Sequence, residues 1–469
     1  MKRRRKAGIA ALLLIAAVCA AAAVWFFGDR KLMTADAAWE DSGDGDRMTV
    51  VAEIGEDLRI LSGTQTLTAG NRTGKTLEEI VLRVPANAVR ENCMVISEVR
   101  ADGVSVEFAF DGDDPTVLRI GAPWAEGETI ELSWRFHLTV PLTGGGIGRT
   151  AESALLVSAL PTLAVYESGA WRTDAYDDLA ESSYAQAFEL EMTLFAPMSV
   201  KAVFGGALTE ASLETGPDTM MYTVRMSGAR DVSLALRTDG ALRQRKIGGV
   251  LVSALADGVL AANALLDRAQ EALASLDAAG LAYPFPSLSI VQDETYTEDG
   301  IVGSGLIALD AESDKEQLLR RITRLIARQT FGVLVENDPW NAPWLSQTLA
   351  SAAEMLAYRQ RRGSSAYETR YYEELEVSTR LTRPYGVTVG ASTAHFGGDS
   401  EMTQVLRDQG AAMLLGIEQA VGEEAFLSAL QRYARENAGK IATQQSLEEA
   451  LREATGSSWD GYLSDGLAS

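Results

Sequence analysis

Residues 323–332 read T-R-L-I-A-R-Q-T-F-G, and residues 344–350, further along the chain, read W-L-S-Q-T-L-A. Apolar residues recur at helical spacing around both segments, which predicts helices at residues 314–335 and 343–362. Arg324 and Arg328 are four residues apart, so they share one face of the first helix. A guanidinium stays protonated and has no lone pair to offer a metal ion. The pattern therefore predicts a cationic helix face that repels divalent metals.

The composition is that of a globular protein of 469 residues, with 46% hydrophobic and 23% charged residues. At about 150 residues per domain, this length suggests about three domains. The formal net charge of −23 argues against a nucleic-acid partner, because phosphates require a basic surface. Cys19 and Cys93 are the two cysteines, too few for a cysteine zinc site. His137 and His395 are the two histidines, and their wide separation makes neither a predicted metal ligand.

The N-terminus has the pattern of a membrane anchor. A basic cluster at residues 2–6 precedes an uncharged stretch at residues 7–28, long enough for a transmembrane helix. The cationic cluster keeps the N-terminus cytoplasmic, so we expect a single-pass protein of the cell membrane whose C-terminal ectodomain lies outside the cytoplasm. We assign residues 1–28 to this signal anchor and residues 29–47 to an acidic linker. Alanines at residues 20–23 leave a cleaved signal peptide as the alternative.

The region from residue 48 to residue 243 has a β pattern. Residues 56–67, 104–110, 129–140, 187–194 and 220–226 form short runs, several with alternating apolar positions, separated by turn residues. Many short strands of this kind predict an antiparallel β saddle or sandwich domain.

Residues 244–469 have mainly helical periodicity. We predict helices at residues 250–278, 314–335, 343–362, 400–421, 423–438 and 444–455, with strands at residues 288–291 and 303–309. The fold class is therefore α+β, with a β domain followed by a mostly helical domain.

The ectodomain resembles the membrane alanyl aminopeptidase family of zinc metallopeptidases, the gluzincins. The resemblance rests on the order and spacing of several segments: residues 58–63, 70–77, 160–166, 169–172, 283–286, 410–412, 422–426 and 442–443, with Tyr433 and Trp459. It implies a β saddle domain followed by a thermolysin-like catalytic domain. The chain stops at residue 469, so we expect the family's large C-terminal helical domain to be absent.

The resemblance also identifies the positions that would carry the chemistry. The family has H-E-x-x-H-Q-x-F-G and W-L-N-E-G-x-A, so Arg324 and Arg328 stand at the two histidine ligands and Leu325 stands at the glutamate base. Gln347 stands at the third ligand, and Arg407 stands at the tyrosine of Y-x-K-G-A. The exopeptidase loop G-A-M-E-N aligns with residues 299–303, which places Val302 at its glutamate. These substitutions predict no catalytic residue, no metal ligand and no cofactor, zinc included.

Arg324, Arg328, Gln347 and Arg407 remain a candidate anion- or peptide-binding site. Guanidiniums gathered in a cleft suit a carboxylate or a phosphate. The alternative, which we favour, is that acids neutralise them in structural ion pairs; the candidates are Glu336, Asp338, Glu354 and Asp408. Ser304 lies in a G-S-G turn, which we interpret as structural because it lacks the G-x-S-x-G pattern and a nearby histidine.

The sequence thus predicts a membrane-anchored pseudopeptidase, a binding or scaffold module for a peptide or a membrane-protein partner. Two alternatives stay open. The chain could be an active metallopeptidase whose site is not recognised in the sequence. It could also be an accessory subunit of a membrane transport or sensing complex.

Overall fold

The chain divides into two units, Met1–Thr34 and Ala35–Ser469. The structure, a computed structural model, describes residues 32–34, 45–177, 179, 184–213, 218–293, 299–311, 314–376 and 386–468. The predicted signal anchor at residues 1–28 and most of the predicted linker at residues 29–47 lie outside these ranges. The end of that linker, Asp46 and Arg47, already belongs to the first strand. Across the described ranges, the structure contains no helix with the length and hydropathy that a membrane span requires.

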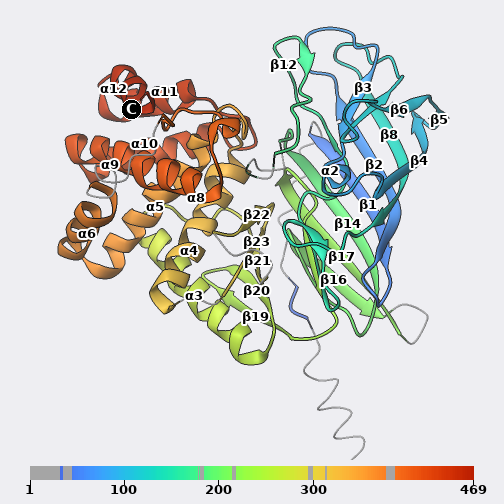
Figure 1. Cartoon of the computed structure of the whole chain (residues 1–469), viewed down its shortest axis with the longest axis horizontal. Coiled ribbons are helices and arrows are strands. Elements are labelled where there is room, and N and C mark those ends of the chain that lie inside the picture. Colours follow the sequence, from blue (N-terminus) through green and yellow to red (C-terminus); the bar gives the residue numbers. More distant parts are fainter. Residues whose placement is uncertain are drawn as a thin grey trace, which may run out of the picture. The chain divides into compact units, whose positions relative to one another are not determined.

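A β lobe forms the first half of the second unit (Figure 1). Its largest sheet has eight strands in the order β16-β17-β14-β1-β2-β8-β4-β5. The bounds are β1 (Asp46–Ile54), β2 (Ile60–Gly70), β4 (Met94–Ala101), β5 (Val104–Ser105), β8 (Thr129–Thr139), β14 (Phe188–Pro197), β16 (Ala207–Leu213) and β17 (Thr219–Ala229). Buried and more exposed residues alternate along β8 and β14, so one face of the sheet packs on the core. The predicted antiparallel sheet is wrong in one pairing, because β1 runs parallel to β14.

Two four-stranded sheets complete the β sandwich. One contains β9 (Ile147–Arg149), β10 (Ser153–Leu156), β15 (Lys201–Phe204) and β18 (Leu234–Arg237). The other contains β3 (Ile80–Arg83), β6 (Phe108–Phe110), β7 (Val117–Ile120) and β11 (Thr162–Leu163).

The second lobe begins with a five-stranded sheet in the order β19-β20-β21-β23-β22. Its strands are β19 (Ala241–Ile247), β20 (Val250–Ala256), β21 (Ser287–Gln292), β22 (Ile301–Gly303) and β23 (Leu306–Leu309). The predicted domain boundary between residues 243 and 244 therefore falls inside β19. The predicted helix at residues 250–278 is wrong in its first part, because β20 occupies residues 250–256. Most of β20 is buried, so this strand lacks the alternation that identifies a half-buried strand.

Helices cover the rest of this lobe (Figure 1). They are α3 (Val259–Ala278), α4 (Lys315–Arg328), α5 (Trp344–Arg362), α6 (Ser364–Arg370), α8 (Asp399–Met402), α9 (Gly410–Val421), α10 (Glu423–Glu436), α11 (Gln444–Thr455) and α12 (Asp460–Leu467). Wider helical turns continue α4 and α8 as η1 (Gln329–Leu334) and η4 (Thr403–Gln409). These elements confirm the predicted order of a β lobe followed by a largely helical lobe.

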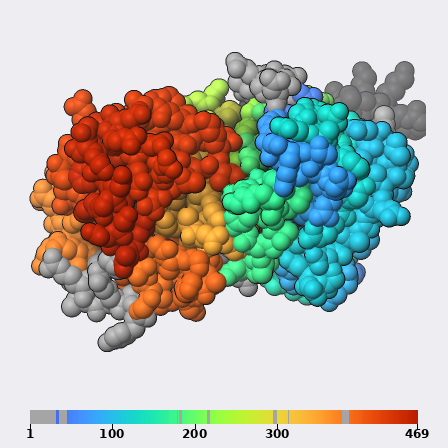
Figure 2. Space-filling view, turned by 90° about the horizontal axis from the view of Figure 1, so that it is seen from above, coloured from blue at the N-terminus to red at the C-terminus, as the bar shows by residue number. Residues whose placement is uncertain are grey.

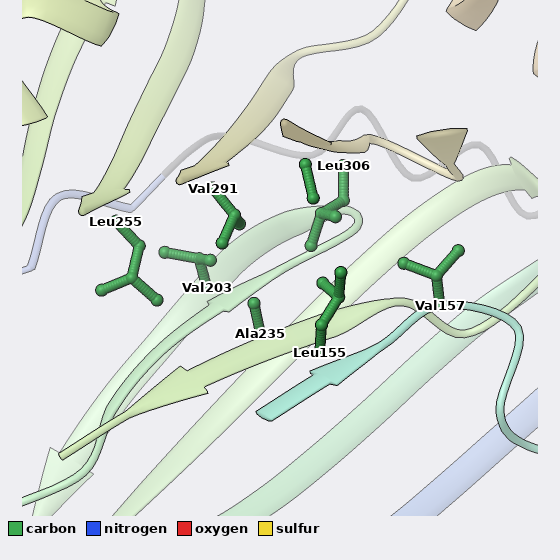
Figure 3. Close-up of a cluster of buried hydrophobic side chains, with 8 residues drawn as sticks. Leu155, Val157, Val203, Ala235, Leu255, Val291 and Leu306 are labelled. Carbon is green, nitrogen blue, oxygen red and sulfur yellow. The ribbon is translucent and has the colours of Figure 1, made fainter. Parts of the chain in front are cut away.

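The two lobes share a hydrophobic core. It joins Leu155, Val157, Val203 and Ala235 of the β lobe to Leu255, Val291, Leu306 and Ala308 of the five-stranded sheet, and Figure 3 shows the side chains from both sides pointing toward one another. In the space-filling view, the green surface of the β lobe lies directly against the yellow and orange surface of the helical lobe (Figure 2). Because this core belongs to both lobes, we expect them to unfold together.

A polar network beside this core also connects the two lobes. Asp231, which is fully buried, accepts hydrogen bonds from the hydroxyls of Ser158 and Ser233 at 2.7 and 2.9 Å. It also accepts one from the backbone N–H of Ser304, in the β22–β23 turn of the other lobe, at 3.0 Å. Burial raises the pKa of Asp231, and its hydrogen bonds with Ser158, Ser304 and Ser233 oppose that rise.

The backbones of the two lobes also meet closely at Gly205. A Cβ atom added there would lie 1.8 Å from the carbonyl oxygen of Ser304. We therefore expect Gly205→Ala to lower the free energy of unfolding by roughly 1 to 3 kcal/mol, because backbone on both sides has to move. Gly112→Ala is the matched control, since a Cβ at Gly112 meets no atom within 4 Å. Urea denaturation of both variants checks this, and equal stabilities would contradict the proposed close contact.

Candidate functional site

Helix α4 presents the first two candidate residues. Its N-terminus is capped by Asp314, whose side chain accepts hydrogen bonds from the backbone N–H groups of Glu316 and Gln317 at 2.9 and 3.0 Å. Ile322 and Leu325 are fully buried and fix the face that the helix turns to the core. Arg324 and Arg328 consequently lie one turn apart at the C-terminal end, where a positive charge also suits the helix dipole.

Asp299, two residues before β22, connects α4 with η4 at this end of α4. Arg324 donates from Nε to Oδ2 of Asp299 at 3.2 Å, and its Nη2 makes a second, short ion pair with Oδ1. Arg407, on η4, places Nη1 2.8 Å from Oδ2 of the same carboxylate. Arg407 also donates from Nε to Oε1 of Gln347, on α5, at 3.4 Å. We call Asp299, Arg324, Gln347 and Arg407 the arginine cluster.

The arginine cluster is almost closed to solvent. The side chains of Asp299, Arg407 and Arg324 are 6%, 9% and 14% exposed, and Gln347 is buried. Three of the four candidate binding residues are thus brought together. The fourth, Arg328, is buried one turn along α4, where the charges of Arg407, Asp399 and Glu336 act on it.

The other family positions are apolar and packed. Leu325 is fully buried, and its Cδ1 lies 2.6 Å from the point where Gly300 would carry a Cβ. Gly300 has a φ of +131°, a conformation that L side chains rarely adopt, so glycine suits this position for two reasons. Val302 lies in β22 and is also buried. The segment at residues 299–302 therefore packs onto α4.

The acids that pair with the arginines differ in part from those predicted. Asp338 pairs with Arg172 at 2.8 Å, and Glu354 pairs with Arg370 at 2.6 Å. Asp408 and Glu336 act on Arg324 and Arg328 through their charge. The acid that bridges Arg324 and Arg407 is Asp299, which is not among the four predicted acids. One signal could have found it: Asp299 stands where the family loop has glycine, and it departs from that pattern together with the arginines.

The residues present at this site do not fit zinc. Burial, and then repulsion from Arg407, lowers the pKa of Arg324 and of Arg328 to about 9, so both remain protonated at neutral pH. A protonated guanidinium donates hydrogen bonds and cannot coordinate a cation. Leu325 offers no donor atom, and the side-chain oxygen of Gln347 already accepts from Arg407. In the described ranges, no group of three or more His, Cys, Asp or Glu side chains is placed to hold a metal ion.

A small cavity adjoins Gln347. Its volume is about 10 Å³, room for about one water molecule. It is lined by Leu179, Glu336, Asn337, Pro339, Pro343, Ser346, Gln347 and Met402. Glu336 is buried; its Oε1 accepts from the backbone N–H of Asn337 at 3.1 Å, and its Oε2 makes no hydrogen bond to the described residues. Burial raises the pKa of Glu336 to about 8, and the charge of Arg230 opposes the rise.

The raised pKa of Glu336 predicts a pH-dependent stability. The folded state holds the proton of the Glu336 carboxyl group more tightly than the unfolded chain does, because the pKa of a glutamate in an unfolded chain is about 4.3. The stabilisation is therefore complete below pH 4 and is lost as the pH rises through about 8. We expect Glu336→Gln, which mimics the protonated acid, to unfold at a higher temperature than the wild type at pH 9. At pH 5 the two should be similar. Thermal unfolding at both pH values checks this, and a variant less stable at pH 9 would contradict it.

Ser304 is a structural residue of the β22–β23 turn. It is buried, and its Oγ accepts hydrogen bonds from the backbone N–H groups of Arg230 and Asp231 at 2.9 and 3.3 Å. His137 and His395 are exposed, and the Nδ1 of His395 hydrogen-bonds to Ser392 at 2.7 Å. The structure thus offers Ser304 no histidine base.

Comparison with known proteins gives consistent results. Residues 282–464 match the peptidase family M1 domain. The chain is 25% identical over 441 residues to aminopeptidase N of Lactobacillus delbrueckii subsp. lactis, a match that covers 87% of this chain and 49% of the relative. The chain therefore spans about half the length of that relative.

Solved structures of similar fold come from Deinococcus radiodurans. A mutant of its M1 zinc metallopeptidase superimposes with a TM-score of 0.68 at 18% identity, covering 90% of this chain and 94% of that one. A mutant bound to a Tyr-Ser-Ala substrate gives 0.64 at 17% identity, with coverages of 90% and 94%. These results show that the chain has the two-domain fold of the M1 peptidase structures, with an N-terminal β sandwich and a helical C-terminal domain, and that residues 282–464 match the peptidase family M1 domain.

Proposed function

We propose that this chain is a pseudopeptidase of the M1 fold, which binds a peptide or a protein without hydrolysing it. One observation carries the proposal: Asp299 joins Arg324 to Arg407 where the resemblance places the first zinc ligand and the catalytic tyrosine. Hydrolysis by this family needs a metal to polarise the carbonyl and a base to activate water. Arg324, Leu325, Arg328 and Gln347 supply neither function.

Binding remains within the reach of the fold. A structural neighbour from Deinococcus radiodurans was solved with a Tyr-Ser-Ala substrate, so this architecture accommodates a short peptide in that protein. We also propose that residues 1–28 anchor the chain in the cell membrane with the ectodomain outside the cytoplasm. Such an anchor would hold the module beside a membrane-protein partner, as a subunit of a transport or sensing complex would require.

The alternative is an active metallopeptidase with an unrecognised site. It is favoured by one observation, that the similar curated relative is named an aminopeptidase. The purified full-length chain, incubated with Tyr-Ser-Ala and with fluorogenic aminoacyl substrates, separates the two. We expect no hydrolysis above the buffer blank, with or without added zinc. Zinc-dependent hydrolysis that a chelator abolishes would establish the alternative. Capture of partners from detergent-solubilised membranes tests the role as an accessory subunit.

A further inference from the structure

The carboxylate of Asp299 is paired with two arginines, as proteins often pair the carboxylate of a bound ligand. Arg324 on α4 pairs with both oxygens of this carboxylate, through one charge-assisted hydrogen bond and one ion pair, and Arg407 on η4 makes an ion pair with Oδ2. Gln347 accepts from Nε of Arg407 and so orients the second guanidinium. The three elements that supply these groups are far apart in the sequence, so the fold itself assembles the site.

The backbone of Asp299 is fixed independently of its side chain. Arg321 donates from Nε to the carbonyl oxygen of Asp299 at 3.3 Å and from Nη1 to that of Asp310 at 3.0 Å. The packing of Leu325 against Gly300 holds the next residue. The chain therefore retains contacts that keep α4, which carries Arg324, near this segment when the carboxylate is removed, and Gln347 still accepts from Arg407.

The described residues leave little room beside Gln347. The adjoining cavity beside Gln347 holds about one water molecule, which is too little for a second carboxylate. Asp299 pairs with both Arg324 and Arg407 and so occupies the position that an external anion would take.

We propose that Arg324 and Arg407 form a carboxylate-binding site whose resident ligand is the chain's own Asp299. The ligand class is a carboxylate, such as an acidic side chain or the C-terminus of a peptide, and it reaches the arginines only by displacing Asp299. This inference rests on the proposed function, because a zinc site at these positions would leave no place for it. It goes beyond the proposed function in two ways: the chain itself occupies the binding site, and the ligands that compete for the site are carboxylates.

The test removes the internal ligand and supplies a free one. Asp299→Gly deletes a CH₂–COO⁻ group, which acetate replaces, and Asp299→Ala deletes a COO⁻ group, which formate replaces. Thermal unfolding of the full-length chain in a mild detergent is compared in sodium acetate, sodium formate and sodium chloride at equal ionic strength. We expect each variant to gain about 2 to 4 °C in its matching carboxylate, because ligands that bind only the folded state stabilise it. The wild type should not respond.

The double variant Asp299→Ala/Arg407→Ala is the control and should gain nothing from formate. No carboxylate-dependent shift in either single variant, or an equal shift in the double variant, would overturn the proposal. If a single variant does not fold in chloride, the refolding yield becomes the readout: recovery in the carboxylate supports the site, and equal loss in both salts refutes it. Zinc analysis of the same samples shows separately whether the proposed function has failed.

Discussion

Replacing Arg230 by alanine is expected to lower the free energy of unfolding by about 3 to 5 kcal/mol, one of the two largest effects predicted for this chain. Arg230 is fully buried between the lobes. Its guanidinium donates to the carbonyl oxygens of Ala185, Val333 and Lys440 at 2.9 to 3.0 Å, and to that of Leu334 at 3.4 Å. Alanine would leave the carbonyls of Ala185 and Val333, both buried residues, without this donor, whereas those of Leu334 and Lys440 keep a backbone N–H donor. Each such loss costs about 1 to 3 kcal/mol when no water replaces the donor.

Burial lowers the pKa of Arg230, and Glu336 opposes the shift. Arg135→Ala is the matched control, because Arg135 is 63% exposed and its partner Glu98 is 59% exposed. Removing such a surface pair changes stability by less than about 1 kcal/mol. Urea denaturation at pH 7 compares the two variants with the wild type. Similar small losses in both would show that Arg230 does not join the lobes.

Glu354→Ala is expected to cost about 3 to 5 kcal/mol, because it leaves the guanidinium of Arg370 buried without its main partner. Glu354, on α5, accepts from Nη1 and Nη2 of Arg370 at 3.0 and 2.6 Å, and both side chains are less than a tenth exposed. Burial pushes the pKa of Glu354 up, but the ion pair with Arg370 outweighs it and holds the pKa below the ordinary value. This stabilisation is present above the unfolded pKa and is lost as the pH falls through the folded one.

The double variant Glu354→Leu/Arg370→Met tests whether the cost belongs to the pair or to the orphaned charge. Apolar residues of similar volume often replace a buried ion pair with little loss. We therefore expect the double variant to recover most of the stability that Glu354→Ala loses, measured as the midpoint of thermal unfolding at pH 7. A double variant as unstable as the single one would contradict this reading.

Local periodicity was enough to predict most of the regular structure. The alternation in residues 56–67 predicted β2, and the apolar spacing in residues 343–362 and 444–455 predicted α5 and α11. It failed where burial removes the pattern, as in β20, and where helices are short, as in α6 and α12. The pairing of β1 with β14 was also out of reach, because a parallel register is set by distant segments.

The sequence was enough to select three residues of the arginine cluster but not the acid that pairs with the arginines. The resemblance to the family selected Arg324, Gln347 and Arg407, which the fold brings into one cluster. The bridging acid came from a loop whose relation to α4 only the tertiary structure reveals. Four other acids were equally eligible from the sequence, and two of them pair with Arg172 and Arg370 instead.

Zinc content measured directly on the purified chain tests the central claim. The full-length protein is equilibrated with excess zinc and freed of unbound metal, and the zinc bound per chain is then measured by elemental mass spectrometry. We expect far less than stoichiometric zinc, with no change in the melting temperature when a chelator is added. The claim is that the pairing of Asp299 with Arg324 and Arg407 replaces the metal. Stoichiometric zinc would contradict this claim if a chelator removed the zinc and lowered the melting temperature.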